Sequence, residues 1–148
     1  MRILADTNVI LDALTSRESW NKSAEKIFLM AANHTIWMYI TASSATDIYY
    51  LIRKHLHNTT DAKLIMEKLY SLTGILEVTA NDCIDALASP ISDYEDAVVE
   101  RVASRTDLDY IVTRNIKDYQ AGDMKIILPD DFVKMVEESE IKKGYRNN

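Results

Sequence analysis

Short apolar segments rich in β-branched and aromatic residues alternate along the chain with longer segments of helical periodicity. Strands that alternate with helices pair in parallel, because each is joined to the next by a right-handed crossover. We therefore expect a single three-layer α/β/α domain around a central, mostly parallel sheet. The predicted strands are "RILA" (2–5), "TIWMYI" (35–40), "ILEVT" (75–79), "DYIVT" (109–113) and "KIIL" (125–128). The predicted helices span residues 9–14, 23–33, 43–56, 61–72, 81–88, 92–105 and 130–139.

Three of these helices carry end signals. Ser92 with Glu95 matches a capping box at the start of helix 92–105, and Ser44 with Asp47 shows the same spacing. Gly74 is expected just beyond helix 61–72, where a left-handed residue commonly closes a helix.

Length and composition indicate one folded domain. The chain has 148 residues, with 47% hydrophobic and 27% charged, as in globular proteins with a sizeable core. We expect the domain to span residues 1–140 and the polar residues 141–148 to form a frayed tail. The single cysteine, Cys83, cannot form an internal disulfide, which fits a reducing, cytoplasmic environment.

Charge and hydropathy exclude several classes of protein. The start of the chain carries two acids within its apolar stretch, unlike a signal peptide, and no apolar run is long enough to span a membrane. A net charge of −6 argues against broad nucleic-acid binding through a basic surface. It leaves a nuclease possible, because a bound cation can supply positive charge locally.

Acidic and amide side chains recur where strands end and helices begin. Asp6 ends the first strand, Asn115 and Asp118 follow the fourth, and Asp47 and Asp96 lie near the starts of their helices. In a parallel sheet these positions share one edge, at which open α/β sheets bind ligands. The sequence therefore predicts that these side chains converge.

Each acid also has a purely structural explanation. Acids are favoured in the first turn of a helix, which covers Asp47 and Asp96, and Asp6 could be a turn residue. Together, however, several carboxylates at one edge repel each other unless a cation joins them. Oxygen ligands of this kind suit Mg²⁺ or Mn²⁺.

Four segments in order resemble the signature segments of the PIN domain, the fold of many metal-dependent nucleases. They are "ILADTNVILDAL", "ITASSATDIYYLIRK", "DYEDAVVERVA" and "DYIVTRNIKDY". The resemblance extends from Met1 to about the final helix and is greatest to the bacterial branch that includes VapC-type toxins.

The resemblance implies a catalytic and metal-binding role for Asp6, Asp47 and Asp96, with Asp47 where the family often has Glu. The fourth acid of the family has two counterparts here. Asn115 stands at the nearest position and would be a ligand without charge, whereas Asp118, three residues on, would keep the acid.

Three further residues are implied to help bind the substrate. Asn8 and Thr113 match positions that orient the first acid or a bound water, as Thr7 also does. Arg114, beside the proposed site, is the best candidate for a phosphate contact.

The resemblance further implies metal-assisted hydrolysis of phosphodiester bonds in RNA or DNA, with no side-chain nucleophile. Relatives of the toxin branch usually form homodimers and are silenced by a small antitoxin protein. One alternative is a PIN fold that binds RNA or a partner without catalysis. Another is a phosphatase with Asp6 as nucleophile, which is disfavoured because position 8 is Asn rather than an acid.

Overall fold

The structure, a computed structural model, describes residues 1–146. Its sheet has five strands, all parallel, in the order β3-β2-β1-β4-β5. The first strand in the chain thus lies at the centre of the sheet. The strands are β1 (Arg2–Ala5), β2 (Trp37–Thr41), β3 (Thr73–Leu76), β4 (Tyr110–Val112) and β5 (Ile126–Ile127).

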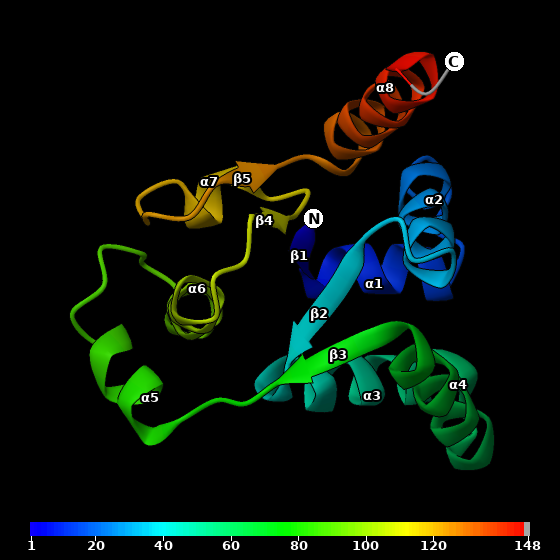
Figure 1. Ribbon diagram of the computed structural model, residues 1–148. Coiled ribbons are helices and arrows are strands. Elements are labelled where there is room, and N and C mark those ends of the chain that lie inside the picture. Colours follow the sequence, from blue (N-terminus) through cyan, green and yellow to red (C-terminus); the bar gives the residue numbers. More distant parts are fainter. Residues whose placement is uncertain (147–148) are drawn as a thin grey trace.

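Helices cover both faces of this sheet, so the predicted three-layer α/β/α architecture is confirmed. Figure 1 shows α5 and α6 on one side and α1 to α4 on the other. The helices are α1 (Thr7–Leu14), α2 (Asn21–Ala32), α3 (Ala42–Leu56), α4 (Thr59–Leu72), α5 (Ala80–Ala86), α6 (Tyr94–Arg105), α7 (Ile116–Tyr119) and α8 (Pro129–Arg146). The short α7 was not expected from the sequence.

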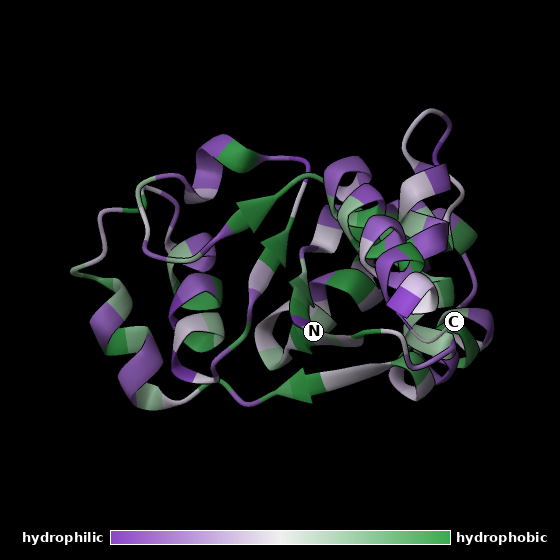
Figure 2. Ribbon diagram, turned by 45° about the horizontal axis from the view of Figure 1, so that its top comes forward, coloured by the Kyte–Doolittle hydropathy of each residue, from purple (hydrophilic) through white to green (hydrophobic). Residues whose placement is uncertain are grey.

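Two hydrophobic clusters fill the spaces between the layers. Ile3 of β1 belongs to the cluster beneath α1–α4 and α8, whereas its neighbour Leu4 faces α6 on the opposite side. This alternation follows from the strand geometry, in which successive side chains point to opposite faces. The helices in Figure 2 are correspondingly banded in hydrophilic and hydrophobic residues, as expected when one face packs on the sheet.

The start of α6 differs from the predicted capping box. The side chain of Asp93, not Ser92, accepts a hydrogen bond from the backbone N–H of Asp96 at 3.0 Å. Asp93 is the preferred N-cap residue because its carboxylate is a strong hydrogen-bond acceptor and its negative charge is favoured at the positive, amino-terminal end of the helix. Glu95 is thereby left without a capping role.

The start of α3 also differs from its predicted cap. Thr41, the last residue of β2, accepts from the backbone N–H of Ser44 at 3.1 Å, and Asp47 lies beyond the first turn. The strand therefore runs directly into the helix without an intervening loop.

The predicted role of Gly74 at a helix end is wrong. α4 ends at Leu72, and Thr73 continues in extended conformation into β3, where Gly74 pairs with Tyr39 of β2. A Cβ atom at position 74 would lie 2.6 Å from Cδ1 of the Tyr39 ring. Gly74 is thus required by the neighbouring strand and not by a turn.

The polar residues from 141 onward, expected to form a frayed tail, are helical in the structure as far as Arg146. α8 continues to Arg146, with an ion pair between Lys143 and Glu140 at 2.8 Å, while residues 147–148 lie outside the described residues. Within residues 1–146, no helix combines the length and apolar character needed to cross a membrane.

Replacing Gly74 with Ala should destabilise the protein by about 1–3 kcal/mol, because the new methyl group overpacks against the Tyr39 ring. Urea unfolding measures this change. In a Tyr39→Ala background the same replacement should lower the free energy of unfolding much less, because the ring is absent. An equal cost in both backgrounds would contradict the proposed clash.

Candidate active site

The carboxyl edge of the sheet holds a pocket of about 520 Å³ whose lining is rich in acids. β1, α3, α6 and the segment after β4 each deliver a side chain to it, as expected for this edge of a parallel sheet. Its acidic residues are Asp6, Asp47, Glu95, Asp96 and Asp118. Asn8, Asn115 and Arg17 line it as well.

Asp6 is the most firmly held of these acids. Its Oδ1 atom accepts from the backbone N–H of Thr7 at 2.9 Å, so it caps α1. Its Oδ2 atom accepts from the side-chain amide of Asn8 at 3.0 Å and from the hydroxyl of Thr113 at 2.8 Å. The carboxylate therefore joins the end of β1 to the end of β4.

Asn8 and Thr113 thus contact Asp6 directly. Asn8 also donates to the Thr113 hydroxyl at 3.2 Å and accepts from the backbone N–H of Arg114 at 3.2 Å. With these bonds in place, both side chains are oriented by the acid and by each other.

Burial raises the pKa of Asp6, against the hydrogen bonds from Thr113, Thr7 and Tyr119, which lower it; the charge of Asp118 raises it further. The pKa of Asp96 is raised to about 6, first by burial and then by the charges of Asp6 and Asp93. None of the ion pairs formed among residues 1–146 includes an acid of this pocket.

A buried tyrosine lies between these two acids. The hydroxyl of Tyr119 donates to Oδ1 of Asp96 at 3.2 Å, and hydrogen bonding from it also lowers the pKa of Asp6. Burial, followed by the charges of Asp6 and Asp96, raises the pKa of Tyr119, so it remains a protonated donor. The whole Tyr119 side chain is shielded from solvent.

The two counterparts for a fourth acid differ in their surroundings. Asp118 lines the pocket together with Asp6 and Asp96, and its charge raises the pKa of both. Asn115 lines the same pocket, and its backbone N–H donates to the Thr113 hydroxyl at 3.0 Å. The electrostatics therefore favour Asp118 as the fourth charged group.

Arg114 does not extend into the acidic pocket. Its guanidinium donates to both carboxylate oxygens of buried Asp12, at 2.7 and 3.2 Å, and lies 4.7 Å from the centre of the Trp20 ring. Arg17, half exposed, is the basic residue that lines the pocket.

The PIN domain family profile matches residues 2–117. The chain belongs to the PIN domain family. PIN nucleases generally use divalent metal ions. No curated protein matches the chain significantly.

Solved structures of PIN proteins share the fold at low sequence identity. A chain of VapBC2 from Rickettsia felis, bound to a DNA fragment from its promoter, is 16% identical with a TM-score of 0.65; the match covers 86% of this chain and 98% of that one. FitAcB from Neisseria gonorrhoeae is 20% identical with a TM-score of 0.63, covering 86% and 97%. Mycobacterium tuberculosis VapC20, a sarcin-ricin loop cleaving toxin, is 13% identical with a TM-score of 0.64, covering 83% and 97%.

The acids of this PIN domain have the donor chemistry of a cation site. All are oxygen donors, and the charges of neighbouring acids contribute to the raised pKa values of Asp6 and Asp96. Within residues 1–146, no three His, Cys, Asp or Glu side chains are close enough together to enclose a cation. A hydrated Mg²⁺ needs only one or two carboxylates, because it keeps several waters. The residues fit such an ion.

Three residues in or beside the acidic pocket were not identified as site residues from the sequence. Tyr119 resembles an ordinary core aromatic, Glu95 was assigned to a cap, and Asp12 has the spacing of an apolar helix face. Only the position of Tyr119 directly after Asp118 offered a signal.

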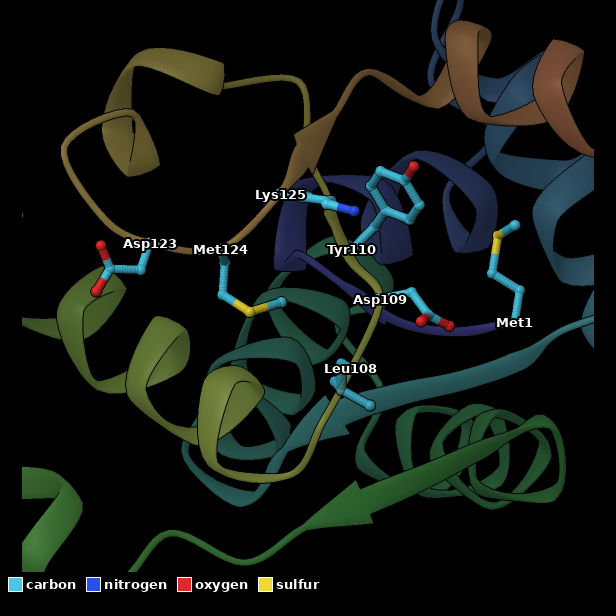
Figure 3. Close-up of a pocket in the computed structure, with 7 residues that line it drawn as sticks. All are labelled: Met1, Leu108, Asp109, Tyr110, Asp123, Met124 and Lys125. Atoms are coloured by element: carbon cyan, nitrogen blue, oxygen red, sulfur yellow. The ribbon is translucent and has the colours of Figure 1, made fainter.

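A larger hollow, of about 620 Å³, lies at the opposite edge of the sheet (Figure 3). It is lined by Met1, by Leu108 to Tyr110 before and at the start of β4, and by Asp123 to Lys125 before β5. One of its acids, Asp109, accepts from the backbone N–H of Arg2 at 2.7 Å. This hollow faces the amino ends of the strands, so it is a weaker candidate for the active site than the acidic pocket, despite its larger volume.

Replacing Asp96 with Asn should stabilise the metal-free protein above pH 6. A carboxyl whose pKa is raised by folding destabilises the folded state above that pKa, and this cost vanishes below the ordinary value of 3.8. Melting curves in EDTA should therefore show a variant more stable than the parent at pH 7, with the difference closing toward pH 4. A variant less stable at pH 7 would indicate that Asp96 is only a structural residue.

Replacing Tyr119 with Phe should destabilise the protein by about 1 kcal/mol at pH 7, because Asp96 loses a hydrogen bond from a buried donor. Tyr110→Phe is the matched control, since Tyr110 packs edge-on against Phe132. Urea unfolding at pH 7 compares the two. Equal effects would mean that the Tyr119 hydroxyl contributes nothing specific to the site.

Proposed function

We propose that this PIN domain is a divalent-metal-dependent endoribonuclease, the toxin of a toxin–antitoxin pair. The observation that carries the proposal is the convergence of Asp6, Asp47, Asp96 and Asp118 in one pocket at the carboxyl edge of a PIN fold. A toxin–antitoxin complex from Klebsiella pneumoniae with the same fold supports it, as does VapC20, which is described as a sarcin-ricin loop cleaving toxin.

In this proposal Asp6 and Asp96 hold the cation, Mg²⁺ or Mn²⁺, through their carboxylate oxygens. Asp118 adds charge from α7 and Asp47 from α3, with Asn115 as the uncharged alternative to Asp118. When bound, such an ion lowers the pKa of an attached water and stabilises charge on the phosphate.

The neighbouring residues act through the acids. Asn8 and Thr113 donate to one oxygen of Asp6 and the backbone N–H of Thr7 donates to the other, so the carboxylate is held in a set orientation before a cation would bind. Arg114 holds the segment after β4 against α1 through Asp12, which positions Thr113 and Asn115. We assign Arg114 this anchoring role in place of direct phosphate binding.

The partners follow from the same proposal. The substrate is RNA, and the chain acts as a homodimer that a small antitoxin protein silences. A toxin–antitoxin complex from Klebsiella pneumoniae, which has the same fold, is the precedent for an antitoxin partner.

Asp6→Asn and Asp96→Asn should each abolish cleavage of single-stranded RNA in Mg²⁺ or Mn²⁺, and EDTA should abolish cleavage by the parent. Asp118→Ala should impair cleavage more than Asn115→Ala does, because Asp118 is charged and acts on Asp6 and Asp96, whereas Asn115 is uncharged. A gel assay with end-labelled RNA measures all four variants. Asp123→Asn, an acid at the opposite edge of the sheet, is the matched control and should cleave normally.

Cleavage that survives both Asn variants, or EDTA, would reject the metal-dependent nuclease. RNA binding without cleavage by the parent in any divalent metal would instead support the non-catalytic binding module.

A further inference from the structure

A groove of about 450 Å³ adjoins the acidic pocket, and the ionisable side chains that line it are basic. It is lined by Leu11, Thr15, Arg17, Leu51, Lys54, His55 and His57, with no acid among them. Leu11, Arg17 and Leu51 line both hollows, so the two lie side by side. An extended ligand could therefore contact both at once.

We propose that this groove binds the phosphate backbone of the RNA strand on one side of the cleavage site. The proposal rests on the proposed function and names which face of the protein the substrate follows. Phosphodiesters are anionic and are bound mainly by Lys and Arg, whereas the acidic pocket alone repels them.

The basic residues of the groove come from separate parts of the chain. Arg17 lies in the turn after α1, and Lys54, His55 and His57 lie at the end of α3. Cations at the end of α3 are also favoured by the helix dipole. That effect does not account for Arg17, which belongs to another segment and faces the same groove.

The charges of the groove are available to a ligand. The side chain of Arg17 is 51% exposed, and its nearest acid, Asp12, lies 3.8 Å away and is already bound by Arg114 at 2.7 Å. Lys54 is exposed, and none of the ion pairs formed among residues 1–146 includes it.

The overall charge makes a local groove necessary. At a net charge of −6 the protein as a whole repels a polyanion, so a strand must be held where basic residues gather. At the acidic end, Tyr50 is 63% exposed and offers a ring on which a base can stack.

The test measures binding of a fluorescein-labelled single-stranded RNA of about 12 nucleotides, a length in the range that single-strand sites cover. Fluorescence anisotropy of the parent chain in EDTA reports affinity without cleavage. The double variant Arg17→Ala/Lys54→Ala should bind roughly 25-fold more weakly at about 0.1 M salt, because each lost phosphate contact removes about 0.7 log units at that salt. Its slope of log affinity against log salt should fall by about 1.4.

The matched control is Lys68→Ala/Lys142→Ala, which removes two exposed charges on α4 and α8, outside both hollows. It should bind RNA almost as the parent does. Lys54→Arg keeps the charge and should also bind normally. Melting curves of each variant show whether it is folded. If Arg17→Ala fails to fold, the single variant Lys54→Ala still tests the groove and should bind roughly 5-fold more weakly, because it loses one contact of about 0.7 log units.

If both double variants weaken RNA binding equally, the proposal that the groove binds RNA would be wrong, and the binding would be due to charge spread over the surface. Unchanged binding by Arg17→Ala/Lys54→Ala would also overturn it and leave the groove to a protein partner. Neither result bears on catalysis, which the metal-dependent cleavage assay decides separately.

Discussion

The carboxylate of Asp6 is the interaction on which the proposed site depends. It caps α1 through Thr7 and receives the hydroxyl of Thr113 at 2.8 Å across 107 residues of sequence. The central strand β1 and its neighbour β4 are thereby held together at the edge where the other acids arrive. A residue that served only as a turn or a cap would not need a further donor from the segment after β4.

This arrangement carries an energetic cost. Burial raises the pKa of both Asp6 and Asp96, and the charges of neighbouring acids raise these values further. Asp118 contributes to both shifts, and Asp6 contributes to that of Asp96. Tyr119 offsets part of that cost by donating a hydrogen bond to Asp96. Raised pKa values of this kind, in a pocket lined by several acids, are typical of functional sites.

Charge is organised on a larger scale around the same pocket. Asp12 binds Arg114 and lies near Arg17, so one buried acid organises two basic residues beside the acidic site. One of them is tied to the segment after β4, and the other borders the groove. An acidic pocket next to a basic groove allows a cation and a polyanion to bind side by side.

The sequence alone determined the order of strands and helices and which acids follow strand ends. Both depend on local features, the period of apolar residues and the residue at each strand end, so both could be predicted. Helix starts were less accurate because several polar residues compete for each cap, as Asp93 and Thr41 show. Gly74 was misplaced because its reason lies in the side chain of another strand, Tyr39.

Only the tertiary structure decided how the acids are supported and where the basic residues lie. Tyr119 meets Asp96 from 23 residues away, and Arg114 meets Asp12 from 102 residues away. No local pattern encodes such contacts, because they arise when separate elements pack on the same sheet. The groove has the same origin, since α1 and α3 form it together and neither segment forms it alone.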